Sequence, residues 1–372
     1  MNFIEESDDE SSKSDDEKTQ DTLKAILTDN IDDWKWPCFE EYFDQLNCSM
    51  QRKVMIESIN ICPFVVIYPR KGNSYVELSS QLLINVLRKI LPKFNKSVEN
   101  NECIKPTVAA RDLFHALEKL KDTLETLTDM DGNVYLKRLI QFVEKEFKQT
   151  ITNRKKMITN KMVSYKMLWV FYTENLEIWY RCAISGQQIG GIITSTKQTK
   201  FGFRIYIDAI NYDSVGFKHC QLERDIDMFE GEVSFSDLPV VPIELSTAQD
   251  FLKESIIANG KQFFNLASGH HFMSYEGPLL RERNMRIEKF KADGRVMIDL
   301  QSFATMNPGY NMGYSQPPNK CDVKMLKEKN IYIKANDINK DSNYFLAPAL
   351  VYGFSFTVKE WGLFEVSKFS DI

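Results

Sequence analysis

The chain has 372 residues, of which 43% are hydrophobic and 27% are charged, as in an ordinary globular protein. That length suits two or three domains, or one large domain with elaborations. The formal net charge of −5 disfavours a general nucleic-acid coat, which needs a basic surface. Aromatic residues make up 12% of the chain, so we expect cores well supplied with large side chains.

Cysteine usage and apolar run lengths favour a reducing, aqueous compartment. Seven cysteines occur without a CxxC pair, which argues against a disulfide framework and a structural zinc site. Residues 1–7 lack the basic and apolar regions of a secretory signal. No apolar run approaches the roughly 20 residues that span a bilayer. We therefore expect a cytoplasmic or nuclear protein with reduced thiols, no bound metal and no membrane partner.

The first 20 residues are acidic and nearly free of core-forming side chains. Such a segment buries too little surface to offset its ordering entropy, so residues 1–20 are predicted to form a disordered tail. The tetrapeptide Ser-Asp-Asp-Glu occurs twice, beginning at Ser7 and Ser14. Because acidic residues after a serine suit acidophilic kinases, both serines are candidate phosphorylation sites. A plain solubilising tail is the alternative interpretation.

Residues 21–160 are predicted to be mainly helical. The stretch 21–60 is interpreted as amphipathic and helical, with large side chains as anchors: Trp34, Trp36, Phe39, Tyr42, Phe43 and Leu46. A short apolar run from Cys62 to Tyr68 predicts a strand. Helical spacing between Leu82 and Leu91, after nearby serines and before a proline, predicts a capped helix.

A two-helix hairpin is predicted over residues 107–150. One seam alternates spacings of four and three, as in a coiled coil: Leu113, Leu117, Leu120, Leu124 and Leu127. A second seam contains Leu136, Ile140, Val143 and Phe147. The segment 129–133 contains a glycine and is expected to break the helix between the seams. An antiparallel pair should then pack on the rest of the protein, or mediate self-association.

Residues 161–372 are predicted to form a β-rich domain. Residues that favour strands dominate from 163 to 242, and Phe203, Ile205 and Ile207 alternate with polar residues as in a half-buried strand. A helix is expected near 247–259, with Gly260 as its C′ residue. The segments 351–356 and 361–366 are predicted to form a terminal hairpin. The fold class is therefore α+β.

Phosphate-loop, kinase, dinucleotide and nucleophile-elbow motifs are absent from the sequence. His270 and His271 are adjacent, and neighbours on a strand point to opposite faces, so we interpret them as structural rather than metal-binding. Asp293 and Asp299 flank a short apolar run, where they could act as an acid–base pair or simply as turn and cap residues. A metal-assisted hydrolase that uses these four residues is the enzyme alternative.

Basic residues offer a third alternative, a nucleic-acid-binding module. The candidate contacts are Lys155, Lys156, Arg283 and Arg286. Arginine and lysine could bind phosphate or an acidic partner. A solvated charged face accounts for the same residues, and with the acidic net charge it leaves nucleic acid disfavoured as a partner.

Several short motifs occur in a fixed order along the chain. Their positions are Gly260, His270, His271, Tyr275, Gly277, Asp293, Gly294, Arg295, Asp299, Asn307, Pro308, Gly353, Trp361 and Gly362. The most specific parts are Asp-Gly-Arg-Val-Met-Ile-Asp and His-His-x3-Tyr-x-Gly. From about residue 60 onward, this order resembles the region of unknown function that precedes the motor in a large, mainly fungal set of AAA+ ATPases.

The resemblance implies a role in recognising a protein partner or substrate. In that family the ATPase core follows the last motif, whereas the Walker motifs are absent from this sequence. We therefore expect no ATPase activity from this chain alone, no catalytic residues and no cofactor. An AAA+ core is an expected partner in cis or in trans, and an ATPase ring would make the protein oligomeric. A fragment of a longer ATPase and a stand-alone relative both fit.

Overall fold

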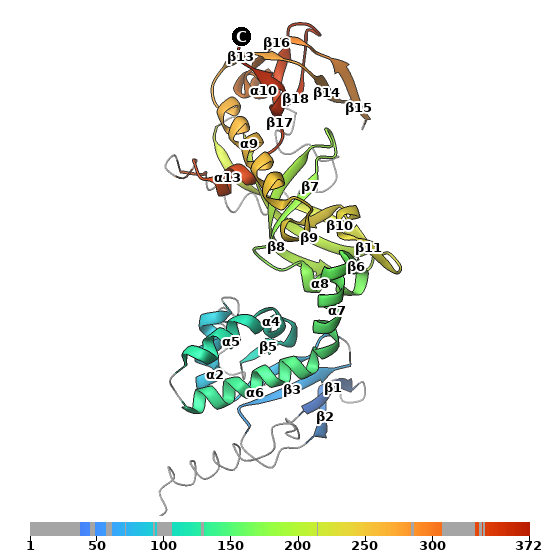
Figure 1. Cartoon of the computed structure of the whole chain (residues 1–372), viewed down its shortest axis with the longest axis vertical. Coiled ribbons are helices and arrows are strands. Elements are labelled where there is room, and N and C mark those ends of the chain that lie inside the picture. The colour runs from blue at the N-terminus through green and yellow to red at the C-terminus, as the bar shows by residue number, and fades with distance from the viewer. Residues whose placement is uncertain are drawn as a thin grey trace, which may run out of the picture. The chain divides into compact units, whose positions relative to one another are not determined.

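The computed structural model describes two units of the chain, shown in Figure 1. The described residues are 38–44, 49–56, 62–70, 72–91, 94, 106–127, 130–213, 215–283, 286–306, 332–334, 337 and 339–372. Unit 1 ends at Thr152, and unit 2 comprises Asn153–Ile372. Each unit contains helices and strands, which confirms the α+β class, and strands dominate the C-terminal half. The predicted tail with Ser7 and Ser14 lies outside the described residues.

Unit 1 is built on a five-stranded sheet in the order β2-β1-β3-β4-β5. Its strands are β1 (Cys38–Asp44), β2 (Ser49–Ile56), β3 (Phe64–Pro69), β4 (Tyr75–Leu78) and β5 (Thr107–Ala109). β1 pairs with β3 in parallel, and the other pairs are antiparallel. β3 and β4 are largely buried, so the core of unit 1 lies against the middle of this sheet.

The predicted helix over 21–60 is wrong where the structure describes it, because β1 and β2 occupy this stretch. The aromatic spacing in this segment resembles a helical stripe over one or two turns, which is too short to settle the type of element. The backbone of β1 instead pairs with β2 on one side and with β3 on the other. Tertiary pairing therefore overrides the local pattern.

Helices cover the sheet of unit 1. They are α2 (Gln81–Ile90), α4 (Ala110–His115), α5 (Leu117–Thr126) and α6 (Met130–Glu146). Ser80 is the N-cap of α2, and its hydroxyl accepts a hydrogen bond from the Leu83 amide, as the sequence predicts. α6 packs on the sheet through Phe142, whose ring centroid lies 5.9 Å from that of Phe64 in β3.

The predicted seams are buried unevenly. Leu120 and Leu136 are fully buried, whereas Leu124 is only half-buried. α5 contacts α6, and the ammonium of Lys121 lies 2.9 Å from the carboxylate of Glu144. The predicted break at 129–133 is corrected, because α6 already begins at Met130. These contacts are compatible with the helical hairpin, which stays a prediction.

The first half of unit 2 contains an antiparallel sheet in the order β10-β9-β8-β7-β12, called here the central sheet. α7 (Lys148–Asn160) and α8 (Leu168–Phe171) precede its strands in the chain. The strands are β7 (Glu177–Arg181), β8 (Gln188–Gln198), β9 (Gly202–Tyr212), β10 (Phe217–Asp227) and β12 (Val240–Pro242). β6 (Met162–Ser164) pairs separately with β11 (Glu232–Ser234).

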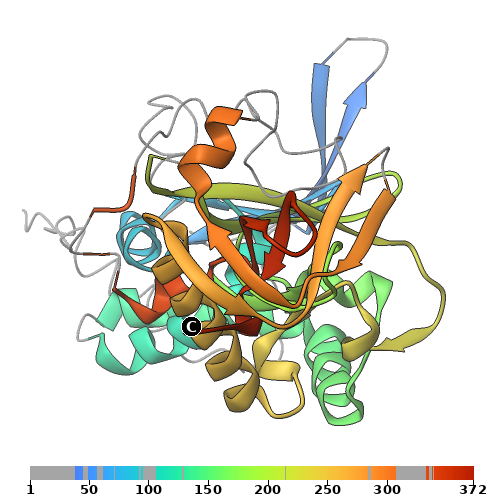
Figure 2. The same ribbon diagram turned by 90° about the horizontal axis from the view of Figure 1, so that it is seen from above.

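The second half of unit 2 contains a seven-stranded antiparallel sheet, called here the C-terminal sheet. Its order is β15-β14-β18-β17-β16-β13-β19. The strands are β13 (His271–Tyr275), β14 (Pro278–Arg283), β15 (Arg286–Lys291), β16 (Gly294–Ile298), β17 (Leu350–Ser355), β18 (Glu360–Glu365) and β19 (Phe369–Ser370). β14 and β15 extend beyond the rest of this sheet, as Figures 1 and 2 show.

Helix α9 (Gln249–Ala267) joins the two sheets of unit 2. It contacts β8 of the central sheet and β17 of the C-terminal sheet, and one hydrophobic core extends over both. Two short helices, α10 (Leu300–Met306) and α13 (Asp341–Phe345), pack on β17 and α9 respectively. Among the described residues, no helix has the length and apolarity to cross a membrane.

The structure corrects the predicted C-terminal end of this helix at Gly260. The sequence suggests a helix over 247–259 with Gly260 as its C′ residue, but α9 continues to Ala267. Gly260 is buried in mid-helix, where a Cβ atom would lie 2.6 Å from the carbonyl carbon of Tyr344 in α13. The glycine therefore permits close approach of two backbones rather than a left-handed cap.

Candidate functional site

The two adjacent histidines make separate local contacts. His270 Nδ1 lies 2.8 Å from Asp299 Oδ2, and His271 Nε2 lies 2.7 Å from the carbonyl oxygen of Ser268. Asp299 also accepts a hydrogen bond from the Ser302 amide at 2.8 Å, so it caps α10. Burial alone would raise the pKa of Asp299, but hydrogen bonds from Ser302 and the nearby His270 lower the pKa overall. These contacts fit the structural interpretation of the histidines.

Asp293 lies at the other end of β16 from Asp299, so the two carboxylates do not form a pair. Asp293 Oδ1 accepts a hydrogen bond from the Gly277 amide at 3.0 Å, and Oδ2 lies 3.1 Å from the ammonium of Lys291. Gly294 has a φ of +132°, which fits a turn residue. Within the described ranges, no group of three or more His, Cys, Asp and Glu could hold a metal ion. The geometry therefore does not support the metal-assisted hydrolase.

Tyr275 and Gly277 pack together at the start of β14. Burial raises the pKa of Tyr275 to about 12, and its hydroxyl donates to the carbonyl oxygen of Pro278 at 2.8 Å. A Cβ on Gly277 would lie 2.9 Å from that hydroxyl oxygen. The Tyr-x-Gly motif thus fixes a corner of the C-terminal sheet.

The last motif glycines also serve packing. Gly353 and Gly362 face each other across β17 and β18. A Cβ on Gly353 would meet the carbonyl oxygen of Met297 at 2.8 Å, and one on Gly362 would meet Leu279 at 2.7 Å. Trp361, next to this pair, packs on the ring of Phe303 with centroids 5.6 Å apart, whereas Arg295 is exposed. Asn307 and Pro308 lie outside the described residues.

The basic residues of the nucleic-acid alternative are not brought together. Lys155 and Lys156 are exposed on α7, whereas Arg286 is exposed on β15. Figure 1 shows α7 and β15 at opposite ends of unit 2. The side chain of Arg283 lies outside the described residues. This arrangement gives no continuous basic surface for a nucleic-acid backbone.

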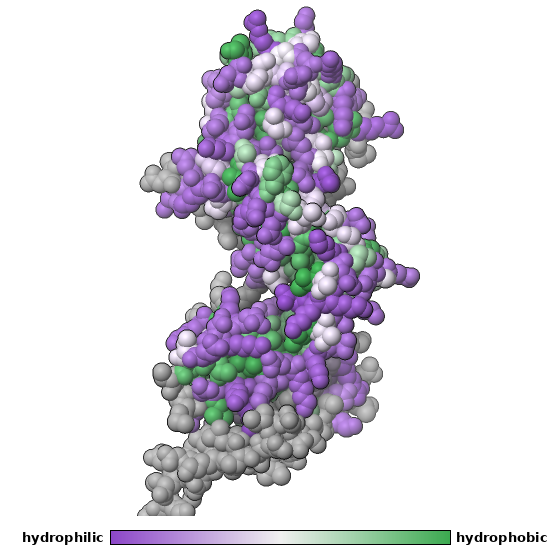
Figure 3. Space-filling view, in the orientation of Figure 1, coloured by the Kyte–Doolittle hydropathy of each residue, from purple (hydrophilic) through white to green (hydrophobic). Residues whose placement is uncertain are grey.

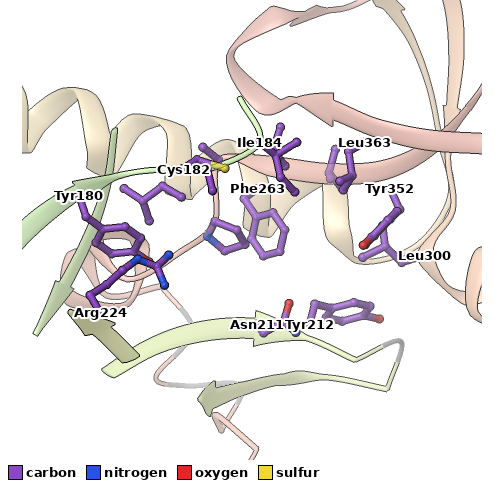
Figure 4. A pocket seen from close by; sticks show the side chains of 16 residues that line it. Tyr180, Cys182, Ile184, Asn211, Tyr212, Arg224, Phe263, Leu300, Tyr352 and Leu363 are labelled. Carbon is purple, nitrogen blue, oxygen red and sulfur yellow. The ribbon is translucent and has the colours of Figure 1, made fainter. Parts of the chain in front are cut away.

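An interior pocket lies between the central sheet and β17 and β18, and Figure 4 shows it from close by. Asn211 and Tyr212 face Phe263 across it. At one end the guanidinium carbon of Arg224 lies 4.9 Å from the ring centroid of Tyr180. The free space is about 50 Å³, enough for a few water molecules. This pocket is too small for an ordinary ligand, since such sites span about 300–1,000 Å³.

A second hollow, called here the Trp179 groove, is open and has about 350 Å³ of free space. It is lined by Trp179, Arg181, Gln188, Ser236, Ser246, Thr247, Ala248, Phe251, Leu252 and Ser255. The indole of Trp179 is only 7% exposed and forms the floor. Its Nε1–H donates to Ser246 Oγ at 2.7 Å, and that hydroxyl donates to the carbonyl oxygen of Pro242 at 3.1 Å. These two hydrogen bonds fix the orientation of the Trp179 indole.

The rim of the groove combines an exposed aromatic ring with a cation. Phe251, in the first turn of α9, is 75% exposed. The guanidinium carbon of Arg181, at the end of β7, lies 5.5 Å from the ring centroid of Trp179. Several hydroxyls line the groove, but the lining residues that the structure describes include no His, Cys, Asp or Glu that could serve as a base or a metal ligand. Such a surface can bind, but it lacks the parts of a nucleophilic site.

Sequence reasoning did not single out this groove. Trp179 lies in the stretch 163–242 that predicts strands, and Phe251 lies in the helix predicted near 247–259, but neither pattern indicates a binding residue. One signal was available: Leu252, Ile256 and Phe263 follow a helical face, and they are buried. Phe251 falls outside that face and should be exposed, which the structure shows.

On the face in Figure 3, hydrophilic side chains predominate and hydrophobic ones appear in small separate areas. Single exposed rings are common on such a surface, so the exposure of Phe251 gains meaning only from its place in the groove lining.

Comparison with known proteins adds one match. Residues 153–247 match the family model described as Domain of unknown function (DUF7025). No curated protein and no solved structure matches the chain. The family match spans the central sheet and includes Trp179, Arg181 and Ser246 of the groove, while Phe251 lies just beyond it. It carries no link to AAA+ ATPases, so over 153–247 the chain is similar to a domain of unknown function.

Proposed function

We propose that unit 2 is a non-catalytic binding module for a protein partner, and that the partner docks in the Trp179 groove. The observation that carries this proposal is an open groove of about 350 Å³ with a rigid aromatic floor. That free space falls within the range of about 300–1,000 Å³ typical of ligand sites. Phe251 at the rim is 75% exposed, so a partner that covers its ring removes apolar surface from water.

The types of residue in the groove favour a protein partner. Tryptophan, tyrosine and arginine are enriched among the residues that dominate binding energies at protein interfaces. The groove presents Trp179 and Arg181 side by side, with Phe251 at its rim. Serine and threonine hydroxyls around these side chains can hydrogen-bond a peptide backbone.

The ordered motifs support the same kind of function. Regions that flank AAA+ motors recognise substrates and partners, and the resemblance extends that role to this chain as a proposal. An AAA+ core supplied in cis or in trans would then act on what unit 2 binds. The genomic sequence beyond codon 372 tests this extension, since an in-frame ATPase core there would support it, and its absence would restrict the proposal to a partner in trans.

Peptide selection tests the groove directly. A library of random 12-residue peptides is selected on the immobilised full chain, and enriched peptides are measured by fluorescence anisotropy. Phe251→Ala should weaken binding at least tenfold, which corresponds to about 1.4 kcal/mol. Phe201→Ala is the matched control, because Phe201 is 86% exposed and lies outside the groove. Enriched peptides that bind both variants like the wild type, or no enrichment at all, would contradict the proposal.

A further inference from the structure

The charge of the Trp179 groove indicates which partner it fits. Arg181 is the only charged residue in the lining that the structure describes. Other arginines of unit 2 are neutralised: Arg204 lies 2.8 Å from Asp225, and Arg281 pairs with Glu360. Within the described ranges, by contrast, Arg181 lies in no ion pair, and its recorded contact is with the indole of Trp179. The groove therefore presents a positive charge that an incoming anion can neutralise.

Two acidic residues on the elements that carry Arg181 and Phe251 are engaged or lie outside the groove lining. Glu177, on the same strand as Arg181, pairs with Lys253 of α9. Asp250, in the first turn of α9, is exposed but is not part of the groove lining. Among the lining residues that the structure describes, no carboxylate therefore competes with a ligand for Arg181.

The guanidinium group of Arg181 suits a carboxylate or a phosphate, because its N–H donors match the oxygen atoms of either anion. Stacking over Trp179 restrains the guanidinium, and an arginine held this way offers parallel N–H donors to carboxylate or phosphate. Hydroxyls of Thr247 and Ser255 line the same groove and can donate further hydrogen bonds.

Apolar surface lies next to this cation. The ring of Phe251 and the side chain of Leu252 line the groove together with the indole of Trp179. A partner that carried only an anion would leave the ring of Phe251 in water, whereas a neighbouring apolar side chain would cover it. Both kinds of contact are therefore expected from one short segment.

We propose that the Trp179 groove recognises a peptide segment in which an anionic side chain, carboxylate or phosphate, is adjacent to an apolar one. Arg181 binds the anion, and Phe251 covers the apolar neighbour. This inference rests on the proposed function, because it names the class of partner for the same groove.

The experiment uses an enriched peptide from the selection on the full chain. Three forms of this peptide are synthesised, with glutamate, phosphoserine or glutamine at one position. That position is the acidic residue of the peptide. In a peptide without an acidic residue, it is the residue before the apolar side chain. The glutamate and phosphoserine forms should bind at least tenfold more tightly than the glutamine form. Arg181→Gln should remove that preference, and Arg295→Gln, on an exposed strand position outside the groove, should leave it intact. Tighter binding of phosphoserine than of glutamate would identify phosphate as the preferred anion, and equal binding would identify a general carboxylate-type site.

The outcomes separate this inference from the proposed function. If binding depends on Phe251 but the three peptide forms bind equally, the groove is a docking site and its anionic specificity is overturned. If the preference for an acid survives Arg181→Gln, the assignment of Arg181 is overturned. If no enriched peptide depends on Phe251, the proposed function fails, and this inference fails with it. Because Arg181 and Phe251 are exposed, both variants should fold, which matching circular dichroism spectra would verify.

Discussion

Replacing Gly260 with alanine should destabilise unit 2, although the same change usually stabilises a helix. In an exposed helix interior, alanine is favoured over glycine by about 1 kcal/mol. At Gly260 the added Cβ would lie 2.6 Å from the carbonyl carbon and 2.9 Å from the Cα of Tyr344, and closer still to its carbonyl oxygen. These are backbone atoms, so no side-chain rotation relieves the overlap.

The magnitude follows from how far α9 and α13 must separate. Ordinary contact begins at 3.4 Å, so the gap must open by about 0.8 Å to clear the carbonyl carbon and by more to clear the carbonyl oxygen. That movement would loosen the packing of Phe264 against Tyr344, whose rings lie 5.3 Å apart. Overpacking costs about 1–3 kcal/mol, and a backbone obstacle favours the upper end, about 3 kcal/mol. For a domain of this size, each kcal/mol shifts the melting temperature by about 2–4 °C, so we expect a loss of about 6–12 °C.

Thermal melts followed by circular dichroism provide the assay. Lys261→Ala is the matched control, because Lys261 is exposed on the adjacent position of the same helix and should leave the melt nearly unchanged. A Gly260→Ala protein that melted at or above the wild-type temperature would refute the reasoning. It would mean that the two backbones do not approach closely and that helix propensity decides the outcome.

Three further predictions concern the core and two ion pairs. Leu120→Ala should lower the stability of unit 1 by about 2–5 kcal/mol, because Leu120 is fully buried, and a melt should show this shift with the unit 2 transition unchanged. The hydrogen bond to Asp208 raises the pKa of His219, so the pair should stabilise the fold fully below about pH 6.5. This stabilisation should decrease as the pH rises through the pKa of the folded state. Urea unfolding midpoints measured from pH 5 to 8.5 should show the decrease, and Asp208→Asn should abolish it. Because the pKa of Asp299 is lowered overall, the ionised carboxylate should stabilise the fold above about pH 4, and this stabilisation should be lost as the pH falls further. In acid unfolding experiments, Asp299→Asn should reduce the dependence of stability on pH more than His270→Ala does.

Strands in the middle of unit 2 could be predicted from sequence because their pattern is local. In β9, Phe203, Ile205 and Ile207 are buried while the residues between them are wetter, as the alternation predicts. The segment that forms β1 and β2 shows no such clear alternation, and its strands depend on pairing with β3. Information about that partner lies outside the segment itself, so a local pattern could not supply it.

The candidate groove could not be predicted from local sequence patterns, because its residues come from different elements. Trp179 in β7 and Phe251 in α9 come from separate elements, and Ser246 lies between them in the chain. Periodicity can predict that Phe251 is exposed, but not that it stands beside Trp179. The hydrogen bond that fixes Trp179 joins residues 67 positions apart. Such contacts follow from the packing of α9 across both sheets, which the fold alone reveals.

The ordered motifs and the groove carry different kinds of information. Gly260, Gly277, Gly353 and Gly362 each lie where a side chain would collide with a neighbouring element. Proteins that share these motifs would therefore share the packing of α9 and the C-terminal sheet, whatever they bind. The Trp179 groove contains none of these glycines, and its exposed residues Phe251 and Arg181 can change without disturbing that packing. Because function resides in such sites rather than in the fold, relatives with the same motifs could recognise different partners through the same groove.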